Sequence, residues 1–233
     1  MVCFVVLLSC KGDGDFVGGG GQSVAGSLSG FSIVEDHLYI LSKNQVDVYV
    51  IDGNEIQKRS RINTTEELET IYPFQDYIFL GSTTGMLVYN IDDHYHPQHI
   101  ATVNHIRSCD PVVADSNFAY VTLRSNGTGC WNGSDALYVY RLDDNFTPDL
   151  VKEYPMYHPK GLAIKDSLLI VCDDGLKLYD RRKPDSLSLL QHINSFTTSD
   201  ALVYDNEVLV TTDERLEMFL VNDTSLIFKS AIY

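Results

Sequence analysis

This chain of 233 residues contains few positively charged residues. It holds 17 Lys and Arg residues against 32 Asp and Glu residues, which gives a formal net charge of −15. A surface with this balance repels phosphate backbones and anionic membranes, so nucleic acid is excluded as an expected partner. Acidity also serves plain solubility, and by itself it identifies no ligand.

Helical periodicity and catalytic signatures are missing as well. No stretch of about 15 residues repeats its apolar positions at helical spacing. The chain has no Gly-x-Ser-x-Gly elbow, and its GGGGQ segment lacks the Lys-Ser/Thr of a phosphate-binding loop. Its five cysteines form no CxxC or closely spaced Cys/His set, so we predict no metal site and no cofactor.

What the chain does have is an internal repeat. Five pairs of apolar segments recur, beginning with HLYIL and VDVYVID and continuing with DYIFL and MLVYNID. The second segment of each pair holds one aromatic anchor, and the anchors are Tyr49, Tyr89, Tyr140, Tyr179 and Phe219. Their spacings of 40, 51, 39 and 40 residues indicate a repeat architecture.

Each repeat contains four candidate strands. The strands are rich in β-branched and aromatic residues, and polar turns such as EDH and DSN separate them. Four antiparallel strands in about 40 residues are typical of a β-propeller blade. We therefore predict an all-β fold, a β-propeller of five four-stranded blades, or part of a larger ring. Neither end of the repeat region offers a spare strand that would complete a split blade.

The N-terminus reads as an export and anchoring segment. Residues 1–10, MVCFVVLLSC, form a short apolar run that resembles a lipoprotein signal ending at Cys10. Cys10 would then be lipidated and would make the only membrane contact. Residues 11–28 are rich in Gly and Ser and are expected to form a flexible tether. The propeller would occupy residues 29–233.

Three longer segments resemble one known family. ETIYPFQDYIFLGSTTGMLVYNID, RSCDPVVADSNFAYVTLRSNGTGC and YPMYHPKGLAIKDSLLIVCDDGLKLYD are similar to the LVIVD-repeat lipoproteins of Bacteroidetes-type bacteria. The resemblance implies a propeller on an exported lipoprotein, at the outer membrane or cell surface. It supplies no catalytic residues. Where many relatives read Asn-Pro-His-Gly, this chain reads His158-Pro159-Lys160-Gly161, which puts a histidine role at that step in doubt.

The third repeat carries an insert, SNGTGCWNGS, which explains the spacing of 51 residues. Trp131, the only tryptophan, lies in this insert and is a candidate platform for a sugar or a protein partner. It could equally be a packing residue. Cys109 and Cys130 belong to one end of this repeat, so a disulfide could pin the insert. The alternative is that both are unpaired, and Cys172 is expected to be a core residue.

Polar residues recur where the first strands begin. Since first strands line the channel of a propeller, Glu69, Asp110 and Asp200 could meet at one mouth, with Arg107, Arg124 and His158 nearby. Two such carboxyl groups are the machinery of many glycoside hydrolases. The simpler interpretation is that repeat geometry favours polar turn residues at these positions.

These observations favour a non-catalytic binding module over an enzyme. The expected partner is an unknown protein or glycan, contacted by Trp131, Arg107, Asp110, Arg124, His158 and Asp200, and the protein is expected to be monomeric. The alternative function is a glycan-active hydrolase that uses carboxylates from different blades. A purely structural envelope role is a third possibility, because the fold class alone does not decide function.

Overall fold

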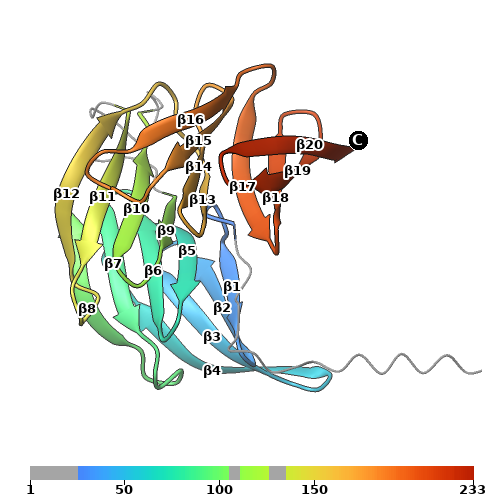
Figure 1. The fold of residues 1–233 in the computed structure, drawn as a ribbon. Helices are drawn as coiled ribbons and strands as arrows, with labels where there is room; N and C mark the ends of the chain where they lie inside the picture. The colour runs from blue at the N-terminus through green and yellow to red at the C-terminus, as the bar shows by residue number, and fades with distance from the viewer. Residues whose placement is uncertain (1–25, 105–110, 126–134) are drawn as a thin grey trace, which may run out of the picture.

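The computed structural model describes residues 26–104, 111–125 and 135–233. These residues form 20 β-strands grouped into five four-stranded antiparallel sheets. The sheets are arranged side by side as the five blades of a β-propeller, with the first and the last sheet at the two ends of an arc (Figure 1). The predicted fold class is therefore confirmed. None of the described residues belongs to a helix that could span a membrane.

The chain builds the blades one after another, so each blade consists of four consecutive strands. Blade 1 comprises β1 (Phe31–Val34), β2 (His37–Ser42), β3 (Gln45–Asp52) and β4 (Glu55–Asn63). Blade 2 comprises β5 (Leu68–Phe74), β6 (Tyr77–Ser82), β7 (Gly85–Asn90) and β8 (Gln98–Asn104). Blade 3 comprises β9 (Val112–Ala114), β10 (Phe118–Leu123), β11 (Ala136–Leu142) and β12 (Pro148–Pro155). Blade 4 comprises β13 (Leu162–Lys165), β14 (Leu168–Cys172), β15 (Leu176–Asp180) and β16 (Ser188–Ile193). Blade 5 comprises β17 (Thr198–Tyr204), β18 (Glu207–Thr212), β19 (Leu216–Asn222) and β20 (Ser225–Ile232).

The five aromatic anchors occupy one equivalent position. Each lies in the third strand of its blade, and the register between third and fourth strands shifts immediately before it in all five blades. Such a bulge adds local twist and bends the outer strand. The periodic spacing read from the sequence therefore marks a recurring backbone feature as well as a recurring side chain.

The core lies between neighbouring blades rather than inside any one of them. Ile71, Ile78 and Leu80 of blade 2, for example, are fully buried in one cluster with Tyr39 and Val46 of blade 1. Burying a side chain of this size stabilises the fold by about 1.5–3 kcal/mol. A blade leaves both faces exposed when alone, so the stacking of blades is what supplies the core.

Antiparallel strands fix which connections share an end of the ring. The links from one blade to the next and the turns between second and third strands lie at one end, which we call the insert end because the insert of repeat three belongs to it. The turns between first and second strands, and between third and fourth strands, lie at the other end. Of the insert, only its first residue, Ser125, is described, and residues 126–134 lie outside the described residues.

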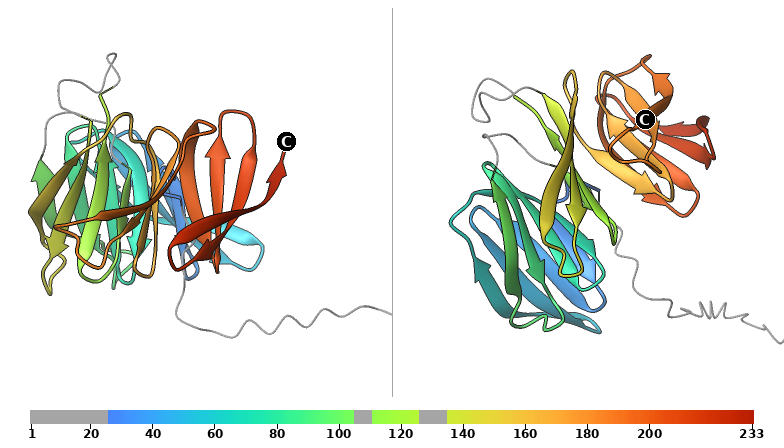
Figure 2. Two further views of the ribbon diagram at one scale, coloured as in Figure 1. Left: turned by 45° about the horizontal axis from the view of Figure 1, so that its top comes forward. Right: turned by 60° about the vertical axis from the view of Figure 1, so that its left-hand side comes forward.

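Residues 26–29 enter the ring before β1 and connect three blades. The buried hydroxyl of Ser27 donates to Asp200 Oδ1 at 2.9 Å and accepts from the backbone N–H of Leu162 at 2.8 Å. The carbonyl of Ser29 accepts from the N–H of Ile71 at 2.9 Å. Residues 26–28, which we assigned to the tether, are thus packed against blades 4 and 5. Figure 2 shows the blades from two further directions.

Candidate functional site

A cavity of about 490 Å³ opens at the insert end, between blades 4 and 5. Three connections build it: the link from β12 to β13, the turn from β14 to β15, and the link from β16 to β17. Its lining residues are Tyr157, His158, Lys160, Asp174, Gly175, Asn194, Ser195, Phe196, Thr197 and Thr198.

Asp173 holds the first of these connections in place. Its side chain is fully buried, and its Oδ1 accepts the backbone N–H groups of Tyr157 at 2.9 Å and His158 at 2.8 Å. Its Oδ2 accepts from Lys177 Nζ at 2.7 Å. The carboxylate therefore neutralises a nearby cation and satisfies two loop amides at once. The Tyr157 and His158 rings that it positions lie perpendicular, with centroids 4.4 Å apart.

A glycine fixes the second connection. Gly175 has a φ of +99°, and a Cβ there would lie 2.2 Å from the carbonyl oxygen of Ile193, so no other residue fits without moving the backbone. The close approach lets the Thr198 hydroxyl donate to the Gly175 carbonyl at 2.5 Å. Blades 4 and 5 are joined by this bond directly beneath the cavity.

The cavity combines aromatic surface with varied polar groups. Tyr157 is 64% exposed and presents a ring to solvent, while Phe196 contributes a partly buried ring. Asn194, Ser195 and Thr197 supply an amide and two hydroxyl groups. Lys160 and Asp174 bring one charge of each sign into the lining. Rings that offer a flat apolar face beside hydrogen-bonding groups suit sugars and peptides.

Asp200 lies next to the cavity but is covered by the protein itself. Its carboxylate accepts from Ser27 and from the backbone N–H of Leu28 and Ala201. Burial raises the pKa of Asp200 above its ordinary value. A Cβ at Gly161 would lie 2.0 Å from Asp200 Oδ1, so the glycine that ends the His158-Pro159-Lys160-Gly161 segment allows this close contact.

The predicted site residues meet only in part. His158 lines the cavity. Asp200 does not, but it follows the lining residue Thr198 by two positions in the sequence. Glu69 of β5 and Arg124, which follows β10, are not among the described residues that line it. Trp131, Arg107, Asp110, Cys109 and Cys130 lie outside the described residues, as does Cys10.

Sequence reasoning did not single out Tyr157, Asn194 or Thr197. They come from links between repeats, which vary in length and carry no periodic signal. Cys172 is buried as expected, and burial raises its thiol pKa to about 12. Among the described residues, no group of three or more His, Cys, Asp or Glu side chains is placed to hold a metal ion.

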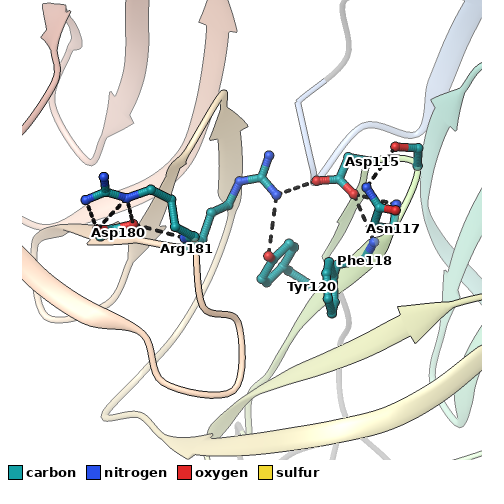
Figure 3. A network of polar contacts seen from close by, with 8 residues as sticks. Asp115, Asn117, Phe118, Tyr120, Asp180 and Arg181 are labelled. Atoms are coloured by element: carbon teal, nitrogen blue, oxygen red, sulfur yellow. Dashed lines mark hydrogen bonds and ion pairs between the residues drawn. The ribbon is translucent and has the colours of Figure 1, made fainter.

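The opposite end of the ring holds a closed polar network (Figure 3). Arg181, which follows β15 of blade 4, forms an ion pair with Asp115 of blade 3. Its guanidinium also lies 5.6 Å from the centroid of the Tyr120 ring. The Arg181 and Asp115 side chains are only 12% and 22% exposed. Because its charges are paired between blades 3 and 4, we interpret this network as an interblade contact that stabilises the fold, and not as a second open binding site.

Comparison with known proteins agrees with the fold. The sequence matches no protein-family model and no curated protein. Among solved structures, a functionally unknown protein from Desulfotomaculum acetoxidans is 10% identical with a TM-score of 0.71, over 90% of this chain and 69% of that one. A putative 6-phosphogluconolactonase from Bacteroides uniformis is 11% identical with a TM-score of 0.65, over 90% and 69%. The periplasmic gluconolactonase of Pseudomonas aeruginosa is 13% identical with a TM-score of 0.61, over 85% and 69%. At these identities the likeness shows the fold alone.

Proposed function

We propose that this protein is a non-catalytic binding module that recognises a glycan or protein partner at the insert end of its propeller. The observation that carries the proposal is the cavity between blades 4 and 5, with the exposed Tyr157 ring beside Asn194, Ser195 and Thr197. A sugar ring would stack on the tyrosine while its hydroxyl groups bond the amide and hydroxyl side chains.

The connection between β10 and β11, to which the insert belongs, starts and ends at the same end of the ring. Asp135 follows the insert directly, and its Oδ1 accepts both the N–H and the hydroxyl of Ser125, the first insert residue, at 2.8 and 2.9 Å. This clamp closes the base of the loop that carries Trp131. Tryptophan is a strong anchor for sugars and proteins, so Trp131 and Tyr157 would serve one partner from two blades.

The proposed cellular setting rests on the sequence alone. An export signal ending at Cys10 would lead to a lipid anchor, and the Gly-rich segment would then hold the propeller away from the outer membrane. The resemblance to LVIVD-repeat lipoproteins supports this setting. Surface display would leave the insert end open to glycans and to proteins of neighbouring structures.

Glycan-array screening followed by calorimetric titration of the best oligosaccharide tests the proposal. We expect Tyr157→Ala to weaken binding by at least about fivefold, since stacking on an aromatic ring supplies about 1 kcal/mol or more. Trp131→Ala should act in the same direction. Tyr95→Ala is the matched control, because Tyr95 is also an exposed tyrosine but follows β7 at the opposite end. Unchanged binding in both Tyr157→Ala and Trp131→Ala would exclude this end as the binding surface.

A glycan-active hydrolase is the second candidate, since two similar structures bear the names of sugar-lactone hydrolases. Among the described carboxylates that the sequence analysis predicted at the channel mouth, Asp200 lies nearest to the cavity. Ser27 and Leu28 occupy its oxygens, which leaves this carboxylate poorly placed for a substrate. Turnover of gluconolactone or of an array oligosaccharide that disappears in Asp200→Asn would favour the enzyme, whereas binding without turnover favours the module.

A further inference from the structure

Burial differs between the middle blades and the two end blades. In β14 of blade 4 all five residues are buried, and in β10 of blade 3 five of six are. In β1 of blade 1 and β18 of blade 5, buried residues alternate with exposed or half-buried ones. Blades 2, 3 and 4 are therefore covered on both faces, whereas blades 1 and 5 are covered on one. Figure 1 shows these two blades at the two ends of the arc.

The uncovered face of blade 1 carries a row of apolar side chains beside the ion-paired side chains of Asp47, Lys58 and Arg61. Phe31, Ile33 and Ile40 are 57%, 45% and 36% exposed, and Phe31 pairs across the sheet with Ile40. They alternate along their strands with residues such as Val34 and Tyr39, which are buried against blade 2. Because side chains alternate faces along a strand, the exposed set lies on the face turned away from blade 2.

Tyr49, the anchor of blade 1, lies on this same uncovered face. Three of the four equivalent anchors, Tyr89, Tyr140 and Phe219, belong to a core cluster with the preceding blade and are 7%, 2% and 2% exposed. The fourth, Tyr179, is half-buried but packs against the core cluster that blade 3 contributes to. Tyr49 is only half-buried, with Lys58 Nζ 6.0 Å from its ring centroid. Blade 1 thus carries the contact residue for a preceding blade that the described residues do not supply.

Blade 5 is uncovered on the opposite side, toward a following blade. Tyr204, Leu220, Ile227 and Ile232 are 61%, 39%, 49% and 64% exposed, and Leu220 pairs with Ile227. They alternate with residues such as Val208, Phe219 and Val221, which are buried against blade 4. The register that buries one set against blade 4 therefore leaves the other set facing away from it.

The exposed apolar residues are concentrated on these blades. Nine large apolar side chains with at least 36% exposure lie in strands of blades 1 and 5, and two lie in strands of the three middle blades. Apolar patches of this extent mark a surface that is covered by a partner. Both uncovered faces thus carry apolar rows, as the covered faces do, and in addition charged residues such as Asp47 and Glu207.

We propose that these two faces are docking surfaces for further four-stranded blades of the same repeat type, which complete the ring between blade 5 and blade 1. The face of blade 1 matches those by which other blades pack on a preceding blade, and the face of blade 5 matches those that receive a following blade. A sheet of this kind offers complementary apolar rows at both ends of the arc.

The similar structures indicate how much is needed to close the ring. Those named above extend beyond the match by about a third of their length, which corresponds to roughly two blades of this size. Two blades fill such an opening, whereas a second copy of this chain would bring five. Since the blade interfaces of this protein join consecutive repeats, we assign the occupant to repeats in series with this chain, and self-association becomes an outcome of the test.

Sedimentation and binding of a fluorescent apolar dye are the first measurements. We expect the 233-residue chain to be monomeric at micromolar concentration and to bind the dye. Ile33→Lys with Leu220→Lys should reduce dye fluorescence several-fold and leave the melting temperature within about 2 °C, since both positions are exposed. Ile78→Lys is the matched control in a covered face, and it should unfold the protein.

An extended chain then tests the occupant itself. A duplicate of residues 162–232, blades 4 and 5, is appended after Tyr233. We expect the extended chain to lose most dye binding and to melt at least about 5 °C higher, with Ile33→Lys and Leu220→Lys now abolishing that gain. A dye signal and a melting temperature equal to those of the original chain would overturn the proposal. So would a dimer of the 233-residue chain that the Lys substitutions dissociate, because a second copy would then be the occupant.

Discussion

Removal of the Asp173 carboxylate should damage both stability and the cavity. In Asp173→Ala, the N–H groups of Tyr157 and His158 lose their acceptor, and Lys177, which is 17% exposed, loses its counter-charge. Breaking a buried pair by removing one partner costs about 3–5 kcal/mol. Because water still reaches Lys177, we expect about 3 kcal/mol, or a fall in melting temperature of about 6–12 °C for a chain of this size.

Urea unfolding monitored by tyrosine fluorescence measures this free energy, and titration of the array ligand measures the cavity. Asp173→Asn keeps an oxygen for the two amides and should lose only about 1–2 kcal/mol. Asp174→Asn makes the same change at the adjacent exposed position and should stay within about 0.5 kcal/mol. Lys177→Met should recover part of the loss in Asp173→Ala, because it removes the unpaired cation. If Asp173→Ala unfolds like Asp174→Asn, the anchoring role assigned to Asp173 is refuted.

Two further predictions concern charges inside the ring. Burial raises the folded-state pKa of Asp200, so the native state holds the carboxyl proton more tightly than the unfolded state does. The stabilisation that this protonated carboxyl gives to the folded state is therefore full below about pH 4. It is lost as pH rises through the raised pKa. Asp200→Asn should therefore gain stability relative to the original protein from pH 4 to 7, and a difference that is flat or falls in urea unfolding would contradict this. Arg181→Met leaves the Asp115 carboxylate without its counter-charge and should cost about 2–4 kcal/mol, while Arg181→Lys should cost less; thermal unfolding that ranks the two variants equally would show that the charge is not what matters.

Much of the fold could be predicted because all five repeats contain the same pattern of apolar segments and aromatic anchors. The spacing of Tyr49, Tyr89 and the later anchors gave the number of blades, and alternating apolar residues gave the strands. A local signal suffices here, since strand formation and turn chemistry depend on nearby residues.

The candidate site could be predicted only at His158, which lies in the cavity wall. Asp200 was expected at an open channel mouth, yet Ser27, 173 positions earlier in the chain, covers it. Nothing near Asp200 in the sequence signals that contact. Tyr157 and Asn194 were missed for a related reason, because loops from separate repeats form the cavity and share no motif.

The sequence by itself determined the repeat, the strands, the alternation of faces and the acidic surface, because each depends on residue types at short spacing. Only the tertiary structure decided which of those faces are covered. Val46 and Phe31 are both apolar residues in strands of blade 1, yet one is fully buried against blade 2 and the other is 57% exposed. The physical reason is that burial requires a partner sheet, and whether a partner is present depends on how the blades are arranged around the ring.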